Sequence, residues 1–178
     1  MTEFDPSRTM DKSEIIDAWR EVSNQVAATF SDYSAEDFPA QREGWSYAQN
    51  LDHLITSTAA VTNSLKLPKL LLRTLFGTGS ASRTSDEVKS AYLAKLDQGS
   101  QASGKFVPTG SQSQQAMLAE WKSTSAKLIT NLDRWNEQQL DRLRLPHPLI
   151  GKLTVREMLY FTIFHTRRHL DNCIKKQA

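Results

Sequence analysis

The sequence has one cysteine, almost no excess of charge and no secretory start, and each shortage excludes a class of protein. Cys173 is the only cysteine, which excludes an intrachain disulfide and a cysteine-rich zinc site. Lysine and arginine together number 22 against 20 aspartates and glutamates, so the charge balance offers no general case for nucleic-acid binding.

Long apolar runs are also missing. The most apolar stretch, residues 65–76, is interrupted by two lysines, one proline and one arginine and is too short to span a bilayer. Residues 1–6 contain no cationic region followed by an apolar run, which a secretory signal requires. We therefore expect a cytoplasmic protein that has neither a nucleic acid nor a membrane as its partner.

What the sequence does contain is enough apolar material for a sizeable core. Hydrophobic residues make up 39% of the 178 and charged residues 24%, so we expect a single folded domain over residues 1–178. Apolar residues recur at helical spacing, and no persuasive alternating strand pattern is present. The spacing predicts an all-α protein whose four long helices lie over 13–31, 46–65, 113–135 and from 154 almost to the C-terminus.

Two of these helices carry sequence signals for their first turns. Ser46 is followed three residues later by Gln49, and Thr154 is followed by Glu157 at the same spacing. In such a capping box the first side chain accepts from a helical N–H group, and the second returns a hydrogen bond to the cap. The pairs therefore predict that helices begin at these two points.

A long insertion over residues 65–110 separates the second and third predicted helices. It contains a short basic helix over 67–76 and another helix over 86–96, each followed by a run rich in glycine and serine, at 77–82 and 99–104. Two interpretations remain open: a surface excursion with flexible joints, which is the commoner case, and a mobile cover over a binding cavity.

The strongest chemical signal is the placement of the histidines. His165 and His169 are four residues apart on the last predicted helix, so both rings leave the same face about one turn apart. Two imidazoles at this spacing can bind one metal ion if another element supplies a third ligand, and His53 on the second helix is the candidate. The alternative is a partly buried pair with ordinary hydrogen bonds.

Other residues near these histidines are assigned simpler roles. His147 lies between two prolines, so we expect it in a loop rather than in the metal site. Cys173 continues the face of the histidine pair, but we expect a small buried residue there. Candidate hydrogen-bond partners or substrate contacts lie three or four residues from a ligand: Asn50, Ser57 and Thr162. The tryptophans are expected in the core or at helix ends: Trp19, Trp45, Trp121 and Trp135.

The positions of the histidines along their helices restrict how the two helices can be placed relative to each other. At about 1.5 Å per residue, His53 lies roughly 10 Å beyond the start of its helix, whereas the midpoint of His165 and His169 lies roughly 20 Å beyond the start of theirs. Parallel helices that began at the same level would therefore hold the three rings apart. A stagger or another crossing is required.

Two separated segments carry a resemblance to a known family. One is residues 44–54, which open with Gly-Trp-Ser and end with His-Leu, and the other is residues 146–170, with Gly-Lys-Leu-Thr at the helix entry. In this order they resemble the DinB/YfiT-like superfamily. The resemblance implies a four-helix bundle, here with the long insertion, and one metal ion, often zinc or nickel, bound by three histidines. Carried over by position, these are His53, His165 and His169.

Members of this superfamily are known or proposed as low-molecular-weight-thiol transferases, thiol-dependent isomerases and metal-dependent hydrolases. Three imidazoles leave a divalent ion with an open position for water or for an external thiol. The sequence has no His-Glu-x-x-His arrangement, so the helix supplies no adjacent carboxylate base. The resemblance therefore implies a metal-dependent enzyme with a small-molecule substrate, with thiol transfer ahead of hydrolysis. A non-catalytic metal-binding or ligand-sensing bundle is the alternative, and a homodimer is expected by analogy alone.

Overall fold

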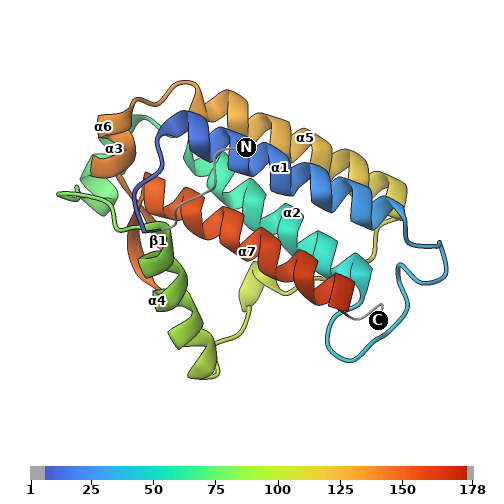
Figure 1. Ribbon diagram of the computed structural model, residues 1–178. Coiled ribbons are helices and arrows are strands. Elements are labelled where there is room, and N and C mark those ends of the chain that lie inside the picture. Colours follow the sequence, from blue (N-terminus) through green and yellow to red (C-terminus); the bar gives the residue numbers. More distant parts are fainter. Residues whose placement is uncertain (1–6, 176–178) are drawn as a thin grey trace.

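Four long helices form a bundle in the computed structural model, which describes residues 7–175. They lie side by side in Figure 1 and are α1 (Lys12–Ser31), α2 (Tyr47–Ser64), α5 (Gln114–Leu132) and α7 (Val155–Lys175). The predicted all-α class is confirmed, and each predicted long helix is present with similar bounds. Residues 1–6, on which the expectation about a secretory signal rests, lie outside the described residues. No described helix is both long and apolar enough to cross a membrane.

Hydrogen bonds at the first turns confirm both predicted capping boxes. The Gln49 backbone N–H donates to the Ser46 hydroxyl (3.1 Å), and the Ser46 N–H donates to the Gln49 side chain (3.0 Å). Glu157 and Thr154 form the same reciprocal pair at the start of α7, at 3.2 and 3.0 Å. These bonds satisfy N–H groups that have no partner within the helix, and they fix where α2 and α7 begin.

The two helices that carry the histidines run in opposite directions. Asn50 near the start of α2 contacts His169 near the end of α7, while His53 one turn later contacts His165 one turn earlier. His53 lies as far from the first residue of α2 as His169 lies from the last residue of α7. The antiparallel pairing therefore brings the rings to the same height, which meets the condition that the sequence imposes.

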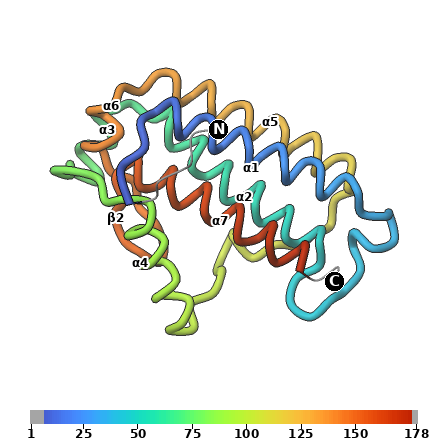
Figure 2. Tube along the Cα trace, viewed as in Figure 1, coloured from blue at the N-terminus to red at the C-terminus, as the bar shows by residue number. Residues whose placement is uncertain are grey.

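The insertion carries the chain back along the bundle. Its elements are α3 (Lys69–Phe76), α4 (Ser85–Asp97) and a 3-10 turn, η1 (Gly104–Phe106). α3 and α4 lie at one end of the bundle, and the tube in Figure 2 then returns to the other end, where α5 begins. α5 therefore runs parallel to its neighbour α2, and near their ends the Asn131 side chain donates to the Thr62 carbonyl (3.0 Å).

Three of the four tryptophans lie in the core, as the sequence predicts. Trp19, Trp121 and Trp135 are each at most 1% exposed, and each indole N–H donates to a backbone carbonyl. The rings of Trp19 and Trp121 also pack against each other between α1 and α5, with centroids 5.7 Å apart. Large apolar surfaces are thus buried without leaving the indole donors unsatisfied, which stabilises the bundle.

A small β-hairpin precedes α7, which corrects the expectation that no strand is present. β1 (Arg144–His147) pairs antiparallel with β2 (Gly151–Thr154), and the paired side chains of Leu145 and Leu153 are buried. Four-residue strands contain too few alternating positions to be distinguished from a loop in the sequence. His147, expected in a loop, is the last residue of β1 and is only 8% exposed.

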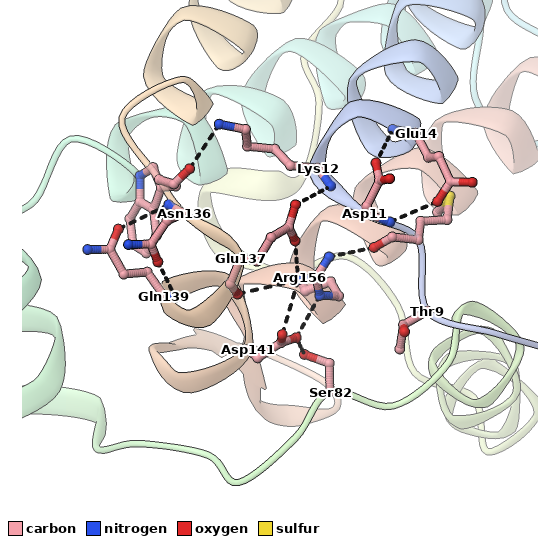
Figure 3. A network of polar contacts seen from close by, with 12 residues as sticks. Thr9, Asp11, Lys12, Glu14, Ser82, Asn136, Glu137, Gln139, Asp141 and Arg156 are labelled. Atoms are coloured by element: carbon pink, nitrogen blue, oxygen red, sulfur yellow. Dashed lines mark hydrogen bonds and ion pairs between the residues drawn. The ribbon is translucent and has the colours of Figure 1, made fainter.

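A buried guanidinium holds the start of α7. Arg156 donates to both carboxylate oxygens of Asp141 (2.6 and 3.1 Å), to the carboxylate of Glu137 (2.6 Å) and to the backbone carbonyl of Met10. Both acidic residues belong to α6 (Glu137–Arg142). Figure 3 shows these bonds together with Ser82 of the insertion, whose hydroxyl donates to Asp141 (2.6 Å). The first glycine- and serine-rich run is therefore bonded to the bundle through Ser82, and its flexibility stays a prediction.

Candidate metal centre

The three histidines predicted as ligands meet between α2 and α7. His53 comes from α2, and His165 and His169 come from successive turns of α7. Their ligand nitrogens all lie within 4.8 Å of one another, and the Nε2 atoms of His53 and His165 are 3.1 Å apart. Within residues 7–175 no other three histidine, cysteine or carboxylate side chains are close enough to hold one ion.

A chain of hydrogen bonds fixes which nitrogen of His169 carries the proton. The Asn50 side-chain NH2 group donates to the carbonyl oxygens of Ser46 (2.9 Å) and Trp45 (3.3 Å), so the Asn50 amide oxygen is left to face His169. Because that oxygen can only accept, Nδ1 of His169, 2.8 Å away, is the donor. The lone pair of His169 is therefore on Nε2, the nitrogen left to bind a metal ion.

His53 is held in the same tautomer by a different partner. Its Nδ1 lies 2.7 Å from the backbone carbonyl oxygen of Phe106, the last residue of η1. A carbonyl oxygen only accepts, so we assign the proton to Nδ1 and the lone pair to Nε2. Histidine ligands of metal ions are usually oriented in this way, through the other ring nitrogen. The insertion thus supplies part of the site.

Burial keeps the three imidazoles neutral. It lowers the pKa of His53, although the hydrogen bond to Phe106 favours the protonated form, and it lowers the pKa of His169 to about 3. The pKa of His165 lies well below its usual value because of burial and of the neighbouring His169 and His53. Neutral imidazole is the form that binds metal. Three such rings fit one divalent transition metal ion, since imidazole suits zinc and nickel alike.

The histidines open onto a cavity of about 810 Å³. Trp45 stacks on His169 with centroids 5.8 Å apart and packs at a tilt on His53 (4.9 Å), so it borders the cavity instead of joining the core. The insertion forms another wall through Tyr92 of α4 and Phe106 of η1. A mere surface excursion is therefore the wrong interpretation of the insertion. It forms part of the cavity wall, and its mobility stays a prediction.

Of the three candidate partners, only Asn50 bonds to the ring of a ligand. The Ser57 hydroxyl donates to the backbone carbonyl of His53 (2.8 Å), and the Thr162 hydroxyl donates to the carbonyl one turn earlier (2.7 Å). Both hydroxyls therefore bond within their own helices. Cys173 is 1% exposed, which confirms a small buried residue at that position.

Replacing Asn50 with alanine is expected to weaken zinc binding by about 10- to 100-fold, the usual cost of losing the group that orients a histidine ligand. The variant lacks the acceptor that holds His169 in one tautomer. Ser57→Ala is the matched control on the same helix and should keep wild-type affinity, because its hydroxyl bonds only to backbone carbonyls of α2. Competition with a chromophoric chelator measures both affinities. Equal affinities in the two variants would contradict this role of Asn50.

His147, the fourth histidine, lies in the cavity wall but outside the ligand group. Its Nδ1 accepts from the backbone N–H groups of Leu149 (3.1 Å) and Ile150 (3.2 Å), which places the ring proton on Nε2. The ring packs edge-on against Phe161 with centroids 4.2 Å apart, and burial lowers its pKa to about 4. His147 is thus a neutral hydrogen-bond donor beside the cavity, a role that its place between two prolines does not reveal.

The lowered pKa of His147 makes stability depend on pH. The folded chain keeps this ring neutral down to about pH 4, whereas the unfolded chain protonates it near pH 6.5, so acid favours unfolding between these values. His147→Asn retains an acceptor for the two N–H groups and removes the titration. Between pH 7 and pH 5 the metal-free wild type should lose on the order of 1–2 kcal/mol more unfolding free energy than the variant. Urea unfolding at both pH values measures this difference, and parallel losses would refute it.

The bundle and its site define a class of protein, in which three histidines from two antiparallel helices face a cavity. The family model of the DinB superfamily matches residues 38–172, and the chain belongs to this superfamily. The match begins after α1 and includes the three histidines and the insertion. It confirms the resemblance seen in the sequence. No curated protein and no solved structure matches the chain.

Proposed function

We propose that this protein is a metal-dependent enzyme that transfers a low-molecular-weight thiol to a small electrophile. In this proposal His53, His165 and His169 hold one divalent transition metal ion, zinc or nickel. When bound, such an ion lowers the pKa of a coordinated thiol and holds it as a thiolate. Membership of the DinB superfamily and the grouping of three neutral imidazoles support metal binding.

The observation that favours thiol transfer over hydrolysis is the chemistry of the cavity wall. None of its described lining residues is aspartate or glutamate, so the wall lacks the carboxylate base that metal-dependent hydrolysis commonly uses. A thiolate needs no protein base once it is formed. Phe161 stacks on His165 with centroids 5.1 Å apart and Trp45 packs at a tilt on His53 (4.9 Å), so apolar rings border the histidines.

Two neutral donors line the cavity beside the histidines. Burial raises the pKa of Tyr92, so its phenol stays protonated at neutral pH, and His147 carries its proton on Nε2. Neither group needs to change its protonation state to donate a hydrogen bond. Such donors stabilise negative charge that develops on a carbonyl oxygen or on a leaving group of the electrophile.

Turnover of a chromogenic aryl chloride by zinc- or nickel-loaded protein tests the proposal. The thiolate sulfur forms a bond to the aryl carbon, chloride leaves with the bonding electrons, and the thiol proton passes to the buffer. We expect turnover to require both the metal and a small thiol, and to disappear on chelation or in His165→Ala. Metal-dependent loss of chloride in thiol-free buffer would replace transfer with hydrolysis. Absence of both reactions with a fully loaded site would overturn catalysis in favour of a non-catalytic bundle.

A further inference from the structure

Arg168 is a cation in the cavity wall for which the described residues supply no acidic partner. It lies on α7 between His165 and His169, lines the cavity and is half-buried. No carboxylate within residues 7–175 forms an ion pair with it, whereas the adjacent Arg167 reaches Glu21 of α1 (3.7 Å) and does not line the cavity. Two neighbouring arginines therefore have different surroundings, and one of them faces the cavity.

Arg168 of α7 and Tyr92 of α4 line the same cavity. Burial raises the pKa of Tyr92, and the charge of Arg168 opposes this shift in part. Because α4 packs against α7, the guanidinium and the Tyr92 phenol belong to walls of one cavity. Lys175 adds a second cation to a lining that contains no described aspartate or glutamate. The charged side chains of the described lining are therefore both cations, which favours an anionic ligand.

The remainder of the wall is largely apolar. The aliphatic and aromatic residues that contribute to it include Leu96, Val107, Leu145, Leu149, Met158 and Phe161. A cation beside an apolar wall is complementary to a molecule with an anionic group and an apolar body. A guanidinium binds a carboxylate or a sulfonate through two parallel hydrogen bonds, and partial burial reduces the screening of this pair by salt.

We propose that the cavity binds a small organic anion, whose carboxylate or sulfonate group pairs with Arg168 and whose apolar body lies against this wall. The proposal names a substrate class for the enzyme and in this sense rests on the proposed function. Binding of the anion, however, depends on Arg168 and the wall and not on a metal ion. The cavity volume of about 810 Å³ is in the usual range for sites that enclose a small molecule.

Two fluorescent probes with the same aromatic body test the role of the anionic group. One is 8-anilinonaphthalene-1-sulfonate, and the other is N-phenyl-1-naphthylamine, which lacks the sulfonate. Arg168→Gln should weaken binding of the sulfonate probe by about tenfold or more, the usual effect of removing a charged hydrogen-bonding partner, and leave the uncharged probe unchanged. Arg167→Gln is the matched control and should leave both affinities unchanged, because this side chain does not line the cavity.

Equal affinity of the sulfonate probe for Arg168→Gln and for Arg167→Gln would overturn the proposal. Retained binding of the uncharged probe shows that the cavity is intact in each variant. If Arg168→Gln does not fold, Arg168→Lys takes its place. This variant should show a smaller loss of affinity, and only for the sulfonate probe. Measurements on metal-free and on zinc-loaded protein separate the two proposals, because a selective loss without metal supports the anion site even where thiol transfer fails.

Discussion

Zinc or nickel content is expected to fall from about one ion per chain to near zero when His165 is replaced with alanine. His165 is the most enclosed of the three histidines, at 4% exposed, and its Nε2 lies 3.1 Å from that of His53. Loss of a residue that only orients a histidine ligand can weaken metal binding by roughly 100-fold. This variant loses the ligand itself, so its affinity for the metal ion should fall by more than that. Metal analysis after dialysis against a weak chelator measures the content.

His147→Asn is the matched control for this prediction, because it removes a histidine from the same cavity wall but outside the ligand group. It should keep the full metal content, whereas His53→Ala and His169→Ala should behave like His165→Ala. Circular dichroism checks that each variant remains helical. Unchanged metal content in all three alanine variants would exclude the site.

The largest loss of stability is expected for Arg156→Met. Methionine fills much of the volume but removes the guanidinium donor from Asp141 and from the Met10 carbonyl. Within residues 7–175, Asp141 then keeps only the Ser82 hydroxyl as a donor, and the Met10 carbonyl keeps only the Tyr160 hydroxyl (3.3 Å). Breaking a fully buried ion pair costs about 3–5 kcal/mol. The side chains of Asp141 and Glu137 are 34% and 54% exposed, so water compensates in part. We therefore expect the free energy of unfolding to fall by about 2–4 kcal/mol.

Arg167→Met is the control for the loss at Arg156. It lies on the same helix and also removes an arginine from an ion pair, but Glu21 is 3.7 Å away and both side chains are well exposed. Such surface pairs contribute less than about 1 kcal/mol. Urea unfolding followed by circular dichroism measures both variants. Losses of similar size would show that the bonds of Arg156 contribute no more than a surface pair.

Local patterns in the sequence were sufficient to predict the long helices and to pair two of the candidate ligands. His165 and His169 share a face because four residues make about one helical turn, which holds wherever the helix lies in the fold. His53 could be named but not placed, because its distance to the pair depends on the relative direction of α2 and α7. That direction follows from the course of the insertion, which local periodicity does not describe.

The rest of the site depends on contacts between distant segments. The Phe106 carbonyl leaves no signal in the sequence, because every residue has such a group. Arg167 and Arg168 are the same residue type at neighbouring positions, so the sequence does not distinguish them. They differ in surroundings because α7 packs on α1 at one side and on α4 at the other. The sequence indicated hydrogen-bond partners only through polar residues three or four positions from a ligand. Of the three such candidates, Asn50, Ser57 and Thr162, only Asn50 bonds to a ligand ring.

The hydrogen bond between His53 and the Phe106 carbonyl couples the affinity of His53 for an ion to the ordering of the loop that contains Phe106. It spans 53 positions of the chain and joins a helix of the bundle to the 3-10 turn of the insertion. Any ligand that requires this tautomer of His53 stabilises the turn, and by thermodynamic reciprocity a contact that holds the turn in place raises the affinity at His53 by the same factor. Residues of the insertion that never touch the ion can therefore tune how tightly it is held.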